Sequence, residues 1–232
     1  MAMLSQVTVV VPVGPGDTLP GALRTQLAGL PADAQVCVVC CDEAGRDAIR
    51  ARQEGAPGPH WEYLLSPRGR AVQQNAGAAA GSGSWLWFVH ADSMFGSDTL
   101  PALSRWLRRD DGALGYFDLR YLGDGPALMR LNAVGAWLRS RLLGLPFGDQ
   151  GLVMPRALFE RLGGFDPALP AGEDHDLVWR ARRAGVPLRP VRAPLYTSAR
   201  KYAERGWGAT TGWHLRETWK QARRFSRSER QP

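Results

Sequence analysis

The sequence predicts one α/β domain with a mostly parallel central sheet, flanking helices and a helical C-terminal segment. Over the first hundred residues, short β-branched runs alternate with stretches of helical spacing. This alternation is typical of parallel strands joined by right-handed crossovers. The chain has 232 residues, 44% of them hydrophobic, which suffices for a single large core. No internal repeat or low-complexity linker divides it, so residues 1–232 are treated as one domain.

The first half predicts a Rossmann-like unit. The run VTVVVPV at 7–13 is β-branched and apolar, as expected for a buried central strand. Three more strands are predicted, at 35–41, 61–65 and 85–89. The helices between them are expected to begin at Asp17 or Thr18 and to span 42–53 and 71–80. Gly77 and the alanines around it predict close packing of the last helix on the sheet.

The second half predicts a more irregular arrangement. Strands are expected at 113–121, 152–154 and 186–191, and the prolines around the last of them predict an edge strand. Helices are expected at 98–108 and 126–143, from Pro155, from Glu173 to Gly185, and from about Thr210. The helix at 126–143 has the spacing of an amphipathic helix. Its apolar positions include Leu128, Leu131, Val134, Leu138 and Leu142.

Charge and cysteine content restrict the partners and the compartment. The net charge of +7 favours anionic partners such as nucleotide phosphates, nucleic acid or an acidic membrane surface. Cys37, Cys40 and Cys41 form no disulfide framework and indicate a reducing cytoplasm. Cys37 and Cys40, three apart on a strand, point to opposite faces, so buried thiols are expected instead of a redox or zinc pair. We find neither a secretory signal nor an apolar run of the roughly 20 residues that span a bilayer.

Polar residues end the strand at 85–89. In extended backbone, His90 and Asp92 point to the same side, where the carboxyl end of a parallel strand commonly meets a ligand. A carboxylate in this position can hold Mg²⁺ or Mn²⁺ together with substrate phosphates. The alternative is that Asp92 only caps the next turn. The pair predicts a metal and phosphate site if the surrounding residues support it.

A second polar group opens the helix at 173–185. Glu173 and Asp174 could be capping residues favoured by the helix dipole. They could also supply a general base, because neighbouring carboxylates raise the basicity of one of them.

Two basic segments complete the candidate features. Arg68 and Arg70 flank a glycine at a helix start, where they could bind a diphosphate or form a solvated turn. The tail from Arg200 onward is rich in tryptophan and arginine. It could lie on anionic lipid at the inner face of the membrane, help to build an acceptor site, or simply pack as an amphipathic helix.

Taken in order, these segments resemble a family 2 glycosyltransferase of the GT-A fold, and most closely a short bacterial subgroup associated with radical-enzyme or arsenosugar-type biosynthesis clusters. The segments that carry the resemblance are VTVVVPV, RGRAVQQNAGAAAGSG, WFVHAD, GDQGLVMPRALFERLGGFD, AGEDHDLVWRARRAG and TSARKYAERGW. They span most of the chain. Residues 1–97 would then bind the nucleotide-sugar and residues 98–232 the acceptor.

The resemblance also implies a role for individual residues. Asp92 would bind Mg²⁺ or Mn²⁺ and the diphosphate, Asp174 would be the catalytic base, and Glu173 would lie beside it. The other implied contacts are Pro12, Val13, Asp42, Arg68, Arg70, Asn75 and His90 for the donor, and Gln150 and Arg200 for the acceptor and diphosphate side.

Two departures from the family pattern affect nucleoside recognition. The family carries Asn-Glu after the first strand, whereas Val13 is followed here by Gly14-Pro15-Gly16. The aspartate that ends the second strand is replaced by Cys40-Cys41, and Asp42 comes one or two residues late. Either Asp42 substitutes for that aspartate, or the base is bound differently, or activity has been lost.

The function implied by the resemblance is inverting, metal-dependent transfer of a sugar from a nucleotide-sugar to a hydroxyl acceptor in the cytoplasm. One alternative is a nucleotidyltransferase of similar fold, which would release pyrophosphate. The other is a degenerate protein that only binds a nucleotide or nucleic acid. Because the sequence contains no recognised nucleic-acid module, we expect no nucleic-acid partner.

Overall fold

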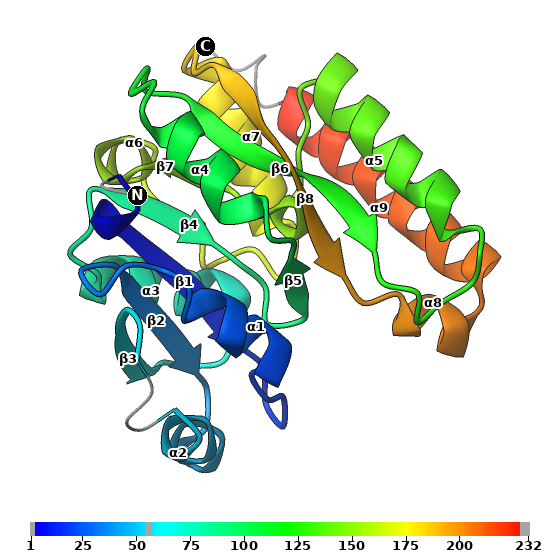
Figure 1. Cartoon of the computed structure of the whole chain (residues 1–232). Helices are drawn as coiled ribbons and strands as arrows, with labels where there is room; N and C mark the ends of the chain where they lie inside the picture. The colour runs from blue at the N-terminus through cyan, green and yellow to red at the C-terminus, as the bar shows by residue number, and fades with distance from the viewer. Residues whose placement is uncertain (1–2, 54–56, 228–232) are drawn as a thin grey trace.

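One mixed sheet of eight strands runs through the molecule in the order β3-β2-β1-β4-β7-β6-β8-β5 (Figure 1). The computed structural model describes residues 3–53 and 57–227, without the side chains at 201, 205, 213–215, 217, 222 and 224–227. The strands are β1 (Val7–Val13), β2 (Gln35–Cys40), β3 (His60–Leu65), β4 (Trp85–Phe88), β5 (Ser93–Phe95), β6 (Leu114–Tyr121), β7 (Val153–Pro155) and β8 (Leu188–Thr197).

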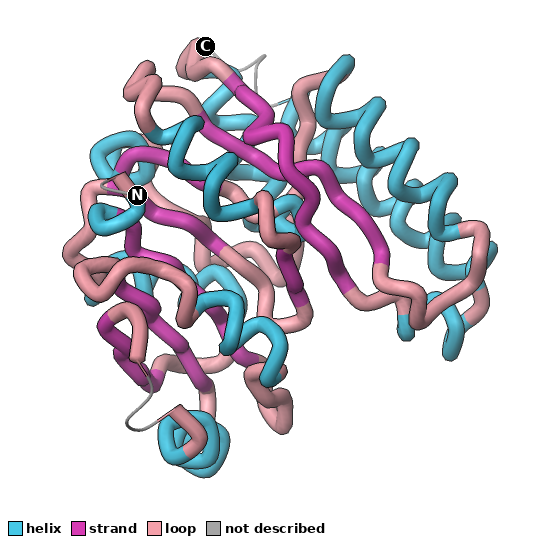
Figure 2. The backbone as a smooth tube through the Cα atoms, in the orientation of Figure 1, coloured by secondary structure: helices cyan, strands magenta, loops and turns pink. Residues whose placement is uncertain are grey.

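Helices cover both faces of the sheet, as Figure 2 shows. They are α1 (Gly21–Leu27), α2 (Glu43–Ala51), α3 (Arg70–Ala80), α4 (Thr99–Leu107), α5 (Met129–Leu142), α6 (Arg156–Arg161), α7 (Glu173–Arg183), α8 (Arg200–Arg205) and α9 (Trp207–Arg227), with the 3₁₀ helices η1 (Leu4–Gln6) and η2 (Gly148–Gln150). The predicted α/β fold is confirmed. None of the described helices is both long and apolar enough to cross a membrane.

The side chains of β1 alternate between two cores, which shows how the sheet separates the helical layers. Val9 and Val11 belong to one core with residues of α1 and α4. Val10 belongs to the other, with residues of α3, α6 and α7. Parallel pairing of β1 with both β2 and β4 places β1 at the centre of the first half, as its uniformly apolar sequence predicts.

The predicted buried thiols are confirmed. Cys37 and Cys40 are buried and belong to β2. Burial raises the pKa of the Cys37 thiol to about 12, so this group is a thiol at neutral pH, which makes it unreactive.

β8 corrects the prediction of an edge strand at 186–191. It spans ten residues and lies inside the sheet, parallel to β6 and antiparallel to β5. Pro190 and Pro194 lack N–H groups, and a β-bulge lets them fit an interior strand. The pairing with β6 shifts from Tyr116–Pro190 to Asp118–Pro194. Arg192 lies within this bulge and has a φ of 61°. The short edge strand β5 was not predicted.

α5 does not bury the large apolar residues that the sequence marks as its amphipathic face. Its inward residues are the small or flexible ones: Met129, Ala133, Ala136 and Ser140. Their size allows close approach to β6, where the Tyr116 hydroxyl donates to the Ser140 carbonyl at 3.1 Å. The apolar positions singled out from the sequence are all exposed: Leu128, Leu131, Val134, Leu138 and Leu142.

Gly77 confirms the predicted close contact between α3 and the sheet. A Cβ placed on Gly77 would lie 2.5 Å from Val10 Cγ1 and 3.0 Å from Val39 Cγ2. Both are buried valines whose β-branched side chains have little freedom to move. A side chain at 77 would therefore push α3 away from β1 and β2.

We expect Gly77→Ala to lower the free energy of unfolding by about 1–3 kcal/mol through overpacking. Gly135→Ala is the matched control, because a Cβ at this position of α5 meets nothing within 4 Å. The control should stabilise the protein by about 0.5–1 kcal/mol through helix propensity. Urea unfolding measures both, and equal effects would contradict the close packing.

Candidate active site

Four segments distant in sequence meet near the carboxyl ends of β1 and β4. They are the residues that follow β4, the start of α3, the 3₁₀ helix η2 and the start of α7. Ligands of open α/β sheets bind at this end of the strands.

Gly148 joins three of these segments. Its N–H donates a 2.5 Å hydrogen bond to Asp174 Oδ2. A Cβ at this position would lie 3.0 Å from Asp174 Oδ2 and 3.2 Å from His90 Nε2. Only a residue without a side chain leaves room for both Asp174 and His90 at this point of the loop. Sequence reasoning used the GDQG segment but did not assign Gly148 this part.

Asp174 is an ionised carboxylate in this arrangement. Burial opposes its charge, but His175, Arg70 and the Gly148 N–H outweigh burial and hold its pKa below the usual value. The expectation that crowding by other acids makes Asp174 more basic is therefore wrong. The nearest charges are a mixture of acids and cations, and the cations prevail.

Asp149 is the carboxylate that does gain basicity, and sequence reasoning missed it. Burial raises its pKa to about 6; Asp174 and Asp92 contribute to the rise, and Arg139 opposes it. Its Oδ1 is buried and has no hydrogen-bond partner among the described residues. An acidic residue directly before Gln150, in a segment already assigned to the acceptor side, was the available signal.

Arg139 supplies the compensating charge and was not predicted either. Its guanidinium lies 3.2 Å from the Phe147 ring centroid and donates to the Leu145 carbonyl and to Gln150 Oε1. Burial lowers its pKa. Arg139 therefore fixes the loop that carries Asp149 while contributing positive charge to the site.

Glu173 and Arg70 form an ion pair across the mouth of the site. Arg70 Nε lies 2.5 Å from Glu173 Oε1. The Glu173 side chain is 4% exposed and that of Arg70 46%, so the pair joins a buried acid to a cation that still faces solvent. The structure brings these predicted residues together, with Glu173 holding an arginine from the donor side.

Asp92 is half-buried and takes part in none of the ion pairs between described residues. Its Oδ2 lies 3.4 Å from the Thr197 hydroxyl at the end of β8. No group of three or more acidic, histidine or cysteine side chains in the described chain could enclose a metal by itself. A single unpaired carboxylate does fit Mg²⁺ or Mn²⁺, since such ions often use one or two carboxylates and complete their shell with phosphates and water.

The remaining donor-side residues lie on the strands and loops around this centre. Pro12 and Val13 are buried at the end of β1. The Gln73 amide, which was not predicted, donates to the carbonyls of Val13 and Val39 and ties β1 to β2. Asp42 caps α2 by accepting the Gly45 N–H at 2.6 Å, which occupies one of its oxygens. Arg68 is exposed before α3.

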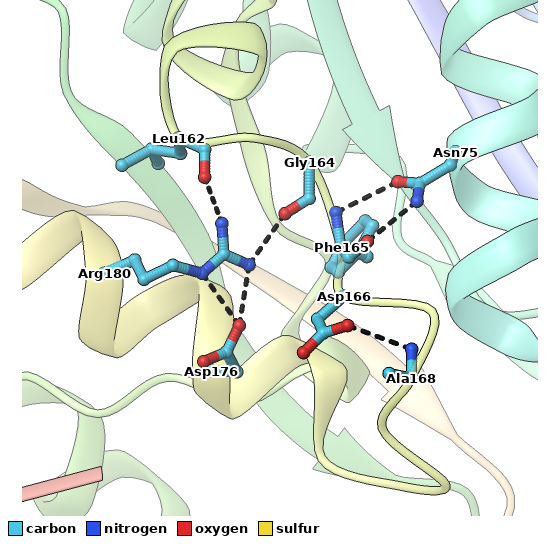
Figure 3. Close-up of polar contacts among 8 residues, drawn as sticks. All are labelled: Asn75, Leu162, Gly164, Phe165, Asp166, Ala168, Asp176 and Arg180. Carbon is cyan, nitrogen blue, oxygen red and sulfur yellow. Dashed lines mark hydrogen bonds and ion pairs between the residues drawn. The ribbon is translucent and has the colours of Figure 1, made fainter. Parts of the chain in front are cut away.

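Asn75 has a structural contact in place of an open position. Its side-chain amide donates to the Phe165 carbonyl at 2.8 Å and accepts the Phe165 N–H at 2.9 Å (Figure 3). The same figure shows Arg180 bonded to Asp176 and to the carbonyls of Leu162 and Gly164. These contacts fix the loop between α6 and α7, and therefore the start of α7.

Gln150 and Arg200, like Asn75, make hydrogen bonds within the protein. Gln150 is fully buried; it donates to the Phe117 carbonyl and accepts from the Phe147 N–H, so it shapes the loop from inside. Arg200 lies at the start of α8, with its Nε 3.1 Å from the Ser198 hydroxyl. Its described contacts keep it beside Asp124, whose carboxylate bonds Ser198 and Ala199.

Comparisons with known proteins identify the fold. No family model and no curated sequence matches the chain. Solved structures do: TarS residues 1–349 from S. aureus superposes with a TM-score of 0.62 at 16% identity, covering 83% of this chain and 60% of TarS 1–349. The mannosyltransferase PcManGT from Pyrobaculum calidifontis, in complex with GDP-Man and Mn²⁺, gives 0.60 at 20%, covering 82% and 56%.

These likenesses show a GT-A glycosyltransferase fold. The same S. aureus protein is also known in complex with UDP, with a TM-score of 0.62 at 18% identity. The present chain spans between 56% and 60% of the length of these three solved chains.

We expect Asp149→Asn to stabilise the protein increasingly as pH rises. Because the folded pKa is raised to about 6, the native state holds a proton that the unfolded chain releases near pH 4. Stability is therefore lost as pH rises between those values, and asparagine removes the loss. Thermal melting should show a gain that widens to about 3 kcal/mol at neutral pH, since each unit of pKa difference is worth about 1.4 kcal/mol.

Asp33→Asn, at an exposed carboxylate in the turn before β2, is the matched control for the loss of a surface charge. A gain for Asp149→Asn that stays constant between about pH 4 and pH 7 would contradict the buried setting of Asp149.

Proposed function

We propose that this protein transfers a sugar from a nucleotide-sugar donor to a hydroxyl acceptor, with inversion at the anomeric carbon and with a divalent metal. One observation carries the proposal: in a GT-A fold, Asp174 and His90 converge on Gly148 at the carboxyl ends of the strands. The metal dependence, the inversion and the similarity to the short bacterial subgroup remain predictions.

Residues 1–97 would hold the donor. The complexes of structural neighbours with UDP and with GDP-Man and Mn²⁺ support this class of ligand. Arg68 and Arg70 are exposed cations at the start of α3, suited to the diphosphate. Glu173 orients Arg70 by the 2.5 Å ion pair. Pro12, Val13 and Asp42 would border the nucleoside.

Asp174 would take the proton of the acceptor hydroxyl. The acceptor oxygen forms a bond to the anomeric carbon as the bond from that carbon to the diphosphate oxygen breaks, and a nucleoside diphosphate leaves. The Gly148 N–H holds one Asp174 oxygen, which leaves the other for the proton. The lowered pKa of Asp174 keeps this carboxylate ionised, and therefore able to accept a proton, at neutral pH.

Asp92 would hold Mg²⁺ or Mn²⁺ together with the donor phosphates. When bound, the ion supplies positive charge against the charge that develops on the diphosphate. His90, two residues earlier in the turn that the Ser93 N–H and the His90 carbonyl close after β4, would contact the donor. Thr197 orients the Asp92 carboxylate from β8.

Residues 98–232 would form the acceptor side. Gln150 would act there from inside, by fixing the loop that carries Asp149. Asp149, whose buried Oδ1 has no described partner, would border the acceptor hydroxyl. Arg200 would meet the diphosphate only if α8 moves from its described contacts with Ser198.

We expect Asp174→Asn to lower turnover by a factor of about 10²–10⁴ while donor binding is retained, because the amide cannot accept the proton. Turnover is measured by release of nucleoside diphosphate, and binding by donor-induced thermal stabilisation. Asp47→Asn, an exposed carboxylate on α2, is the matched control. Undiminished turnover would contradict the assignment of the base, and release of pyrophosphate would indicate a nucleotidyltransferase.

The pH dependence separates the two candidate bases. If Asp174 is the base, kcat/KM should stay constant as pH falls to about 4, because its pKa is lowered. If Asp149 is the base, activity should fall as pH drops through about 6. We expect the first profile for the wild type and for Asp149→Asn. An acidic limb near pH 6 that Asp149→Asn abolishes together with activity would transfer the role to Asp149.

Metal dependence is tested without catalysis. A panel of nucleoside diphosphates, with and without Mn²⁺, should show thermal stabilisation that needs both the metal and one particular base, because ligands that bind only the folded state stabilise it. Asp92→Asn should abolish the metal-dependent part. Equal stabilisation of both proteins by Mn²⁺ would contradict the assignment of Asp92, and absence of any stabilisation would favour a degenerate protein.

A further inference from the structure

α5 presents a continuous apolar surface to solvent. We define the α5 apolar face as the large hydrophobic residues on its outer side and at its two ends, which are 42–71% exposed: Leu128, Leu131, Val134, Trp137, Leu138, Leu142 and Leu143. The opposite side of the helix, with Ala133, Ala136 and Ser140, packs on the protein. Large contiguous apolar surfaces mark sites of association with a partner or a membrane.

The charge around this face has one sign. Residues 128–143 contain three arginines and no acidic residue. One of them, Arg141, is neutralised by Asp118 at 2.7 Å, and Arg139 is directed into the protein. Arg130 is exposed beside the apolar face. An apolar helix face bordered by cations and lacking acids fits an anionic surface.

α9 extends the same pattern. Arg216, Lys220 and Arg223 are exposed along it at helical spacing, and Trp219 is 57% exposed. The Arg223 guanidinium lies 3.5 Å from the centroid of a Trp219 ring. Tryptophan and arginine are the residue types that favour the boundary between lipid headgroups and acyl chains.

The two helices form one surface. Asn132 of α5 accepts from Trp207 Nε1 at 2.9 Å and donates to the Thr211 hydroxyl at 3.1 Å, so α9 is held against α5. Figure 1 shows them running side by side at one end of the molecule. The apolar face of one helix and the cations of the other therefore belong to the same region.

We propose that α5 and α9 dock this protein on an anionic phospholipid surface. α5 lies in the plane of the interface with its apolar face among the first acyl carbons, and Arg130, Arg216, Lys220 and Arg223 contact lipid phosphates. Trp219 lies at the headgroup boundary. The inference does not rest on glycosyl transfer, since none of these residues belongs to the candidate active site.

A second copy of the chain fits this surface less well. A symmetric dimer brings the same patch of both subunits together. The cations of α9 and Arg130 would then approach their own copies, and the sequence of α9 offers one acidic residue, Glu217, against five basic ones. Anionic lipid satisfies the apolar face and the cations at once.

Vesicle co-sedimentation of the full chain tests the proposal. We expect binding to vesicles of phosphatidylglycerol mixed with phosphatidylcholine, and at least tenfold weaker partitioning to pure phosphatidylcholine, because each basic residue near an anionic surface contributes roughly fivefold. The triple variant Leu131→Gln/Leu138→Gln/Leu142→Gln should lose at least about tenfold in partitioning. Leu65→Gln, at the exposed leucine of β3, is the matched apolar control and should bind as the wild type does.

Charge is tested separately. Arg216→Gln/Arg223→Gln should weaken binding to anionic vesicles by roughly 20-fold. Arg108→Gln/Arg109→Gln, which removes two exposed arginines at the end of α4, should leave it unchanged. All variants are produced as folded protein, checked by circular dichroism and thermal melting, so that a loss of binding is not a loss of fold.

Two results would overturn the proposal. One is equal loss of vesicle binding in the matched controls, which would show nonspecific attraction by net charge. The other is a wild-type dimer in light scattering that the triple leucine variant converts to a monomer, with no vesicle binding by either protein. That result would assign the α5 apolar face to a second copy of the chain.

Discussion

The approach of the Gly148 backbone to the Asp174 carboxylate governs the candidate site. The Gly148 N–H, 2.5 Å from Asp174 Oδ2, joins the loop before β7 to the start of α7, and His90 Nε2 lies close to the same glycine. Each neighbouring contact maintains this distance. Gln150 and Arg139 fix the loop from below, while Asn75 and Arg180 fix the segment that leads into α7.

The electrostatic character of the site follows from the same approach. Carboxylates from three segments are held near one another, and they differ because their cations and donors are unequally distributed. Asp174 receives the Gly148 N–H and the positive field of Arg70, so its pKa falls. Asp149 is buried with an unpartnered oxygen, and its pKa rises to about 6. Neighbouring acids in one site can therefore lose their protons at different pH.

Much of this arrangement was predictable from local sequence. β1 and β4 are continuous apolar runs and α3 is rich in small residues, and the bounds of all three fall within one or two residues of the prediction. The grouping of His90, Arg70 and Asp174 in one site was implied by the resemblance to the glycosyltransferase family, because their positions at strand and helix ends do not by themselves bring them together. The position of β8 was not predictable, because prolines indicate an edge until the bulge that accommodates them is known.

The predictions that were wrong or missing share one cause, because each depends on contacts between residues far apart in the sequence. Asn75 bonds a backbone 90 residues away, and the basicity of Asp149 depends on charges from α3, α5 and α7. The outward direction of the leucines on α5 depends on the small side chains that face β6. The spacing of apolar residues predicts that a helix has two different faces. Which face is buried depends on the elements that pack against the helix.

The inner position of β8 also sets an order for assembly during synthesis. β5 immediately follows Asp92, yet its strand partner is β8, and the Asp92–Thr197 contact joins residues 105 positions apart. While a ribosome is still making the second half, the first half can pair β1, β2, β3 and β4, but the segment after Asp92 has no neighbour in the sheet. The segment that carries Asp92 therefore lacks its neighbour in the sheet until β8, whose Thr197 lies 105 positions later in the chain, has been made.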